Sequence, residues 1–272
     1  MTSTINTNNV SFSHIYNILT SSTHNGSDSI KLGDFAGQVW NNNPPSTVPV
    51  QGNETSINTH FRSGEIGGNN IPGGTYQIGS GTTNSTKSPF YGLYDYSQYG
   101  IIYYASEIHN ATGTSTGTPG TISSLFFEYK GWSTNYTANN QTVKISHVGS
   151  ATQIEQGSTV DVDYSNVLTL TNTTTVKSNF QFKNPSSESW EEIGENVTGQ
   201  STGFDTNFSW NGTDNILISW ENRDGSWASG YAWLEGTSAT KRAHSWFEDD
   251  SYPAYASSTN INVRANIRLV FS

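Results

Sequence analysis

The sequence predicts an all-β fold, an antiparallel β-sandwich or jelly-roll-like domain, preceded by an extended N-terminal arm with at most one short helix. Three observations carry this prediction. From residue 86 onward, short runs of alternating apolar and polar residues recur about every 8–15 residues, separated by Gly, Asn and Ser. No long run with helical spacing and capping residues interrupts them. The chain also contains 8 Trp, 14 Tyr and 12 Phe, large side chains that disordered chains lack.

The sandwich is expected to span residues 86–272, and its strands can be placed from their periodicity. The clearest alternation is near the C-terminus, where Arg264 and Arg268 fall on the polar face of an expected strand. The apolar run 101–105 is too short to be assigned as a helix. The expected strands are 121–129, 143–148, 160–164, 166–171, 174–182, 215–221, 229–235, 242–248 and 261–271.

Residues 1–85 are expected to form the arm, because their small apolar anchors lie between Gly-, Asn- and Pro-rich connectors. Residues 10–19 have the apolar spacing of one short amphipathic helix. Segments 29–37 (SIKLGDFAG) and 56–64 (SINTHFRSG) share a pattern of Ser-Ile, then Phe, then Gly. We expect the arm to attach to neighbouring subunits through buried anchors, which are Phe12, Ile15, Ile30, Phe35, Ile57 and Phe61.

Composition and charge argue against several classes of partner. The net charge is −10 and the 12 Lys and Arg residues form no cluster, so we expect no nucleic-acid binding. The chain has no Cys, and its 6 His are scattered without metal-ligand spacing, so we expect no metal and no other cofactor. The chain contains no run of about 18 apolar residues, so we expect no membrane insertion. The first 25 residues lack the basic and apolar regions of a signal peptide.

The sequence offers little support for catalysis. The adjacent acids Glu191 and Glu192 would point to opposite faces of a strand, so they are no ready-made pair for glycoside hydrolysis. The acidic run 248–250 is interpreted as solvated turn charge, and nucleophile motifs are missing. Asp161 and Asp163 share one strand face, where carboxylates can bind Ca²⁺, but the spacing is not that of an EF-hand loop. We therefore expect a protein that is not an enzyme.

A cluster of aromatic and polar residues late in the chain suggests a sugar-binding surface. Exposed aromatic faces beside Asp, Asn or Arg hold sugars by stacking and hydrogen bonding. The alternative is that the Trp side chains fill the sandwich core, which is favoured for Trp220 and Trp246. The candidate glycan contacts are Trp227, Tyr231, Trp233, Arg223 and Asp224, with Trp227 in a loop as the strongest.

Two parts of the chain resemble known families. Segments 98–108 (QYGIIYYASEI), 120–129 (GTISSLFFEY), 214–227 (DNILISWENRDGSW) and 266–271 (NIRLVF) resemble a β-sandwich module of bacterial surface proteins. That resemblance implies the fold and an exposed, adhesive or structural setting, without catalytic residues. Segments 10–15, 29–37 and 56–64 are similar to short N-terminal repeats of tail-fibre and baseplate-type structural proteins of tailed bacteriophages. The phage repeats often end in Phe-Arg-Gly, whereas this chain has Phe-Arg-Ser-Gly at 61–64.

Together these features predict a virion structural protein of a tailed phage, located in a tail fibre, the baseplate or a head decoration. Its arm would bind other virion proteins, and its sandwich would project outward, with possible contact to host-surface glycans. Ordering an arm costs about 1–2 kcal/mol of backbone entropy per residue, so a homo-oligomer, a trimer or symmetric ring, is expected. The alternative is a free carbohydrate-binding or adhesive β-sandwich module.

Overall fold

The computed structural model divides the chain into two compact units, Met1–Gly68 and Asn69–Ser272. In the first unit, β1 (Val39–Trp40) pairs with β2 (Ser46–Thr47) in antiparallel register. All six expected arm anchors, and the helix expected at 10–19, lie outside the described residues. The structure describes residues 39–40, 46–47, 70–87, 89–131, 136–155, 158, 161–163, 170–195, 197–227, 233–237, 241–252, 257–261 and 263–272.

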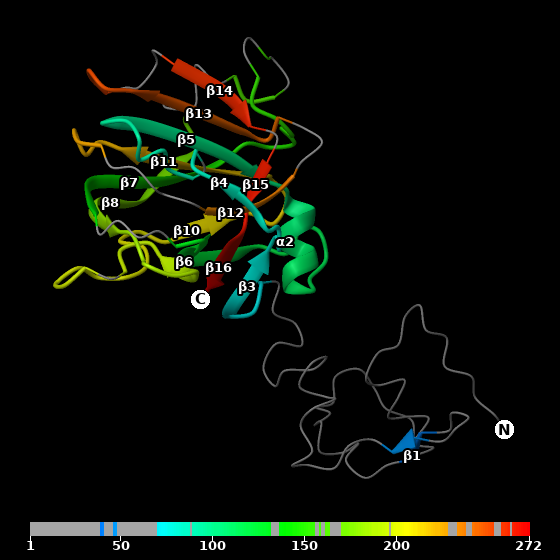
Figure 1. Ribbon diagram of the computed structural model, residues 1–272. Coiled ribbons are helices and arrows are strands. Elements are labelled where there is room, and N and C mark those ends of the chain that lie inside the picture. The colour runs from blue at the N-terminus through cyan, green and yellow to red at the C-terminus, as the bar shows by residue number, and fades with distance from the viewer. Residues whose placement is uncertain are drawn as a thin grey trace. The chain divides into compact units, whose positions relative to one another are not determined.

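The second unit consists of two antiparallel sheets packed face to face, which confirms the predicted fold class (Figure 1). The six-stranded sheet has the order β14 (Ser257–Ile261), β13 (Ala243–Glu248), β5 (Tyr96–Tyr103), β11 (Ile216–Asn222), β7 (Thr137–His147) and β8 (Thr173–Lys183). The main path of the eight-stranded sheet is β15 (Val263–Ala265), β12 (Trp233–Thr237), β6 (Gly120–Tyr129), β16 (Ile267–Phe271) and β3 (Gly74–Ile78). Three shorter strands join it, β4 (Thr83–Ser85) on β12, and β9 (Ser189–Glu192) and β10 (Phe208–Trp210) on β6.

The core between the sheets is rich in aromatic side chains. Trp220 on β11 stacks on Phe90 with ring centroids 5.8 Å apart and meets Trp233 of the opposite sheet at 6.0 Å. Tyr129 and Phe182 contact the Trp233 ring at 4.8 and 5.2 Å. Large rings that touch across the two layers bury much apolar surface, which is the main stabilising contribution to such a sandwich.

The central strands of the six-stranded sheet are buried on both faces. All seven residues of β11 are buried, although a half-exposed strand would alternate. One face of β11 contributes Ile216, Ile218 and Trp220 to the inter-sheet core. The other face contributes Leu217 to a second cluster, which includes Ile154 and other residues of a loop that crosses the outside of the sheet. The loop therefore covers the outer face of β11.

A short helix, α2 (Ala105–Thr112), follows β5 directly and was not expected in this part of the chain. Its first turn is capped by Glu107, whose carboxylate accepts a hydrogen bond from the Tyr104 backbone N–H at 2.9 Å. Gly113 ends the helix in the left-handed conformation, at φ 70°. Two arginines distant in the chain, Arg242 just before β13 and Arg264 on β15, bind the same Glu107 carboxylate. A tertiary ion pair thus supports an eight-residue helix that would be marginal alone.

Several strand boundaries differ from the sequence-based predictions. The sandwich begins before residue 86, because β3 pairs with β16 and β4 pairs with β12. The expected strand 261–271 is interrupted at Asn266, which is fully buried and bonds Gly81 and Glu128 through its amide. Of the expected strand 160–164, the described residues show one isolated bridge, between Ile154 and Val162. The expected strand 166–171 lies mostly outside the described residues.

Candidate ligand-binding site

The turn after β11 places Asp224 at the centre of a polar cluster. Gly225 adopts φ 69°, which lets the chain reverse, and its N–H donates to the Asp95 carbonyl at 3.1 Å. The Asp224 carboxylate accepts hydrogen bonds from the Asn139 backbone N–H at 2.8 Å and from its side-chain amide at 3.0 Å. It also accepts one from the Tyr136 hydroxyl. Burial, together with this bond to Asp224, raises the pKa of Tyr136 from its ordinary value of 10.0 to about 12.

Arg223, the residue before Asp224, has its guanidinium engaged within the protein. It donates to Glu221 at 2.8 and 3.1 Å and lies 3.9 Å above the Tyr252 ring. The Glu221 side chain is 1% exposed and also pairs with Lys144 at 2.5 Å. Arg223 therefore compensates a buried carboxylate, while the 41% of its side chain that is exposed borders the turn.

The aromatic candidates for glycan contact separate into exposed and buried. Trp227 is 62% exposed and belongs to the same turn as Asp224. Trp233 is 1% exposed, so the prediction that it contacts a glycan is wrong, because its ring packs into the inter-sheet core. Trp220 and Trp246 are buried, as the core interpretation of these residues predicted. Tyr231 lies outside the described residues.

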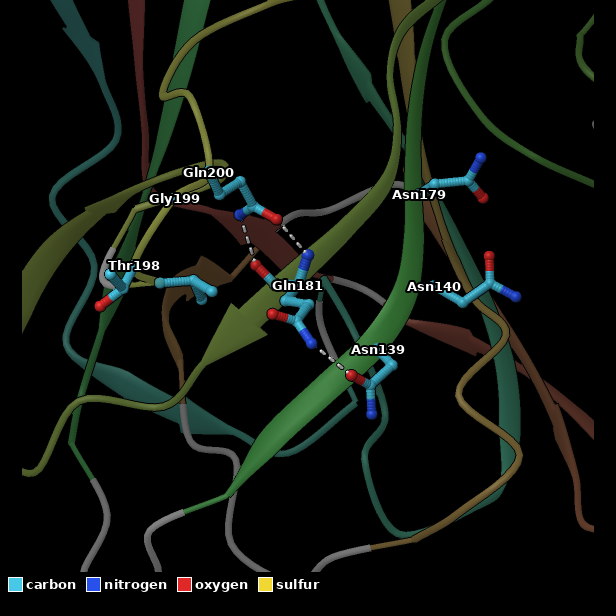
Figure 2. Close-up of a pocket in the computed structure, with 8 residues that line it drawn as sticks. Asn139, Asn140, Asn179, Gln181, Thr198, Gly199 and Gln200 are labelled. Carbon is cyan, nitrogen blue, oxygen red and sulfur yellow. Dashed lines mark hydrogen bonds between the residues drawn. The ribbon is translucent and has the colours of Figure 1, made fainter.

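An open hollow of about 660 Å³ lies where β7, β8 and the loop 197–200 meet (Figure 2). Primary amides dominate its lining, accompanied by one hydroxyl, one glycine and one aliphatic side chain. Its volume falls in the range of roughly 300–1,000 Å³ typical of small-molecule sites. The residues that line it are Asn139, Asn140, Asn179, Gln181, Val197, Thr198, Gly199 and Gln200.

Irregular pairing of β7 with β8 shapes this hollow. The register between the two strands shifts three times between Ala138 and Lys144. Asn140 and Asn179 both adopt φ 52°, and among the described residues they alone have positive φ without being glycine. Asn tolerates the left-handed conformation better than most residues, so the sequence matches the geometry of the bulges. The irregularity turns the backbone of both strands at the hollow.

Hydrogen bonds connect the amides in a chain that ends at Asp224. The Gln200 side chain accepts from the Gln181 backbone N–H at 2.6 Å and donates to the Gln181 carbonyl at 2.8 Å. The Gln181 side chain donates to Asn139 Oδ1 at 2.6 Å, and Asn139 donates in turn to Asp224. Figure 2 shows the Asn140 and Asn179 side chains on the same side of this chain. The carboxylate thus orients a series of neutral groups.

The other sequence-based candidates have internal partners. Glu191 is 6% exposed and accepts from Ser189 at 2.5 Å, while Glu192 accepts from Ser124, so the two acids do face different surroundings. Asp161 accepts hydrogen bonds from Thr152 and Gln153. Burial acts to raise the pKa of Asp161, but these bonds outweigh it and hold the pKa below the usual value. Within the described part of the chain, no group of three or more metal-ligating side chains occurs.

Sequence reasoning did not identify the amide-lined hollow, because its residues come from three separate segments of an Asn-rich chain. Comparison with known proteins found no matching family model, no matching curated protein and no matching solved structure. None of the helices in the described ranges has the length and apolar character needed to cross a bilayer.

Proposed function

We propose that the chain is a non-enzymatic structural protein of a tailed bacteriophage particle, attached through its N-terminal segment and displaying the β-sandwich outward. The tail fibre, the baseplate and a head decoration are the locations that the resemblance of the N-terminal motifs implies. The partners are other virion proteins and further copies of the same chain.

The observation that carries this proposal is the division of the chain between Gly68 and Asn69. In the part of the chain that the structure describes, both sheets of the sandwich are built from strands at or beyond Gly74. The described residues of the main core cluster all lie at or beyond Ile71. The motifs 29–37 and 56–64 thus precede a domain that has its own core, an arrangement suited to attachment.

The surface of the sandwich also supports a display role. Charged residues make up 12% of the whole chain, and several of those in the sandwich form internal ion pairs. Among the large hydrophobic side chains described, Leu93 and Trp227 are the exposed ones. A rigid sandwich with a polar surface suits a protein that projects into solvent and contacts other surfaces through a few specific sites.

Mass spectrometry of purified particles, separated into heads and tails, tests the proposal. Peptides of this chain in stoichiometric amounts in one fraction are the expected result, and their absence from both fractions refutes it. Multi-angle light scattering of the full chain provides a second measurement. A trimer or ring that dissociates when Ile57 and Phe61 are replaced by Asp is expected, whereas the same mass in both proteins contradicts attachment through these anchors.

The alternative function is a free carbohydrate-binding or adhesive module, which the amide-lined hollow and the exposed Trp227 favour. The two functions differ in where the protein is found. A free module is missing from purified particles and binds glycans as a soluble monomer, whereas a virion protein copurifies with particles whether or not it binds glycans.

A further inference from the structure

We infer that the amide-lined hollow between β7, β8 and the loop 197–200 is a binding site for a neutral oligosaccharide. The inference rests on the sandwich alone. It can therefore fail while the particle assignment stands, and the particle assignment can fail while it stands.

The chemistry of the lining selects the ligand class. Five of the eight lining residues have primary amide side chains, and each amide carries two donors and an acceptor. Sugar hydroxyls also donate and accept, so they can pair with an amide N–H or an amide oxygen that has no partner within the protein. None of the described lining side chains is ionisable, which disfavours phosphate, carboxylate or metal ions. Val197 is the single large aliphatic side chain of the lining, which disfavours an apolar ligand.

The hollow keeps hydrogen-bonding capacity available for a ligand. No described residue bonds the Asn179 side chain, which is exposed. Asn140 donates to the Arg223 carbonyl at 3.3 Å and keeps its amide oxygen for another donor. By contrast, Gln181 and Asn139 are bonded to each other and oriented by Asp224. One half of the site is thus preorganised, which lowers the entropy lost on binding.

Two residues that line the hollow have backbone conformations that are unusual for a strand. Asn140 and Asn179 hold left-handed conformations inside paired strands, where regular β-structure would be more favourable. The turn that carries Asp224 also presents Trp227 three residues later, with 62% of that side chain exposed. An exposed indole face can pack against the C–H face of a sugar ring, although Trp227 is not among the residues that line the hollow.

The test uses the full chain on an array of neutral and of acidic oligosaccharides, followed by titration calorimetry with the neutral oligosaccharide that gives the strongest signal. Asn179→Asp replaces amide donors by a carboxylate without changing side-chain size. Its matched control is Asn84→Asp, the same substitution at an exposed position on β4 of the other sheet. We expect Asn179→Asp to weaken binding by about tenfold or more, since a lost hydrogen bond leaves a polar group unpaired. We expect Asn84→Asp to retain wild-type affinity.

A second variant separates loss of binding from loss of folding. Asn179→Gly removes the amide but tolerates φ 52°, so the protein should remain folded by circular dichroism while binding falls by a similar factor. The inference is overturned if no neutral oligosaccharide on the array binds, if only acidic oligosaccharides bind, or if both Asn179 variants bind as well as the Asn84→Asp control.

Discussion

The ion pairs of Glu107 on α2 with Arg242, just before β13, and with Arg264, on β15, allow a quantitative test of how the sandwich is held together. Glu107 binds Arg242 and Arg264, and Arg242 is 5% exposed. Arg242 also donates to the Ile102 carbonyl at 2.8 and 3.1 Å and lies 3.7 Å above the Tyr104 ring. The substitution Glu107→Gln removes the negative charge and leaves the size of the side chain unchanged.

The expected loss of unfolding free energy depends on the Arg242 charge, which stays buried after the substitution. Removing one partner of a buried ion pair typically costs about 3–5 kcal/mol, because the other charge stays out of water without compensation. An amide oxygen at position 107 can still accept from the Tyr104 N–H, and Arg242 keeps its bonds to Ile102. The lower end, about 3 kcal/mol, is therefore expected. The matched control is Glu188→Gln, whose pair with Lys130 has side chains 50% and 44% exposed and should contribute less than about 1 kcal/mol.

Urea denaturation of the full chain, followed by Trp fluorescence, measures both free energies of unfolding. With a slope of about 2–3 kcal/mol/M, a loss of about 3 kcal/mol lowers the midpoint by about 1–1.5 M. The control should shift it by less than about 0.5 M. If the two variants differ by less than about 0.5 kcal/mol, Glu107 does not compensate a buried charge and the reasoning is wrong.

Three further predictions use the same measurement. Burial acts to raise the pKa of Glu107, but the hydrogen bond and the positive charge of Arg242 outweigh burial and hold this pKa below the ordinary value of 4.5. The stabilisation by ionised Glu107 is therefore fully present above pH 4.5 and is lost as the pH falls through the pKa of the folded state. The wild type should thus lose more stability between pH 7 and pH 3 than Glu107→Gln does. An equal loss in both proteins would contradict this assignment. Trp233→Ala should cost about 3–5 kcal/mol and Trp227→Ala less than about 0.5 kcal/mol, since one ring is buried and the other exposed; similar costs would mean that the core is misassigned. Asn179→Val should cost about 1–2 kcal/mol because a β-branched residue resists positive φ, whereas Asn179→Gly should stay within about 0.5 kcal/mol of wild type; a tolerated Val would argue against the left-handed conformation.

Local periodicity was sufficient to predict the long strands. The alternation in 121–129 and 174–182 corresponds to β6 and β8 within two residues at each end. Short elements were missed for a physical reason. The strand β10 has three residues and β9 has four, too few for a period of two to stand out, and both exist because they pair with β6. The helix α2 was missed because part of its stability comes from arginines more than a hundred residues away.

The candidate site was predictable only in part. The Asp-Gly pair at 224–225 indicates a turn, and the loop position of Trp227 made its exposure a reasonable prediction. Trp233 was misjudged because an aromatic residue in a short strand has the same sequence signal on either face. The hollow could not be predicted, because Asn139, Asn179 and Gln200 are joined by the pairing of β7 with β8 and by a loop that folds back on it.

The sequence by itself determined that this chain forms an antiparallel β domain with an aromatic core, because strand periodicity and turn residues act over a few positions. It placed the start of the sandwich at residue 86, whereas the pairing of β3 with β16 and of β4 with β12 extends the sandwich to earlier residues. Tertiary structure alone decided which aromatic rings are buried, where β7 and β8 bulge, and which amides gather at one hollow. These outcomes depend on register and on the facing sheet, and both are set by residues far apart in the chain.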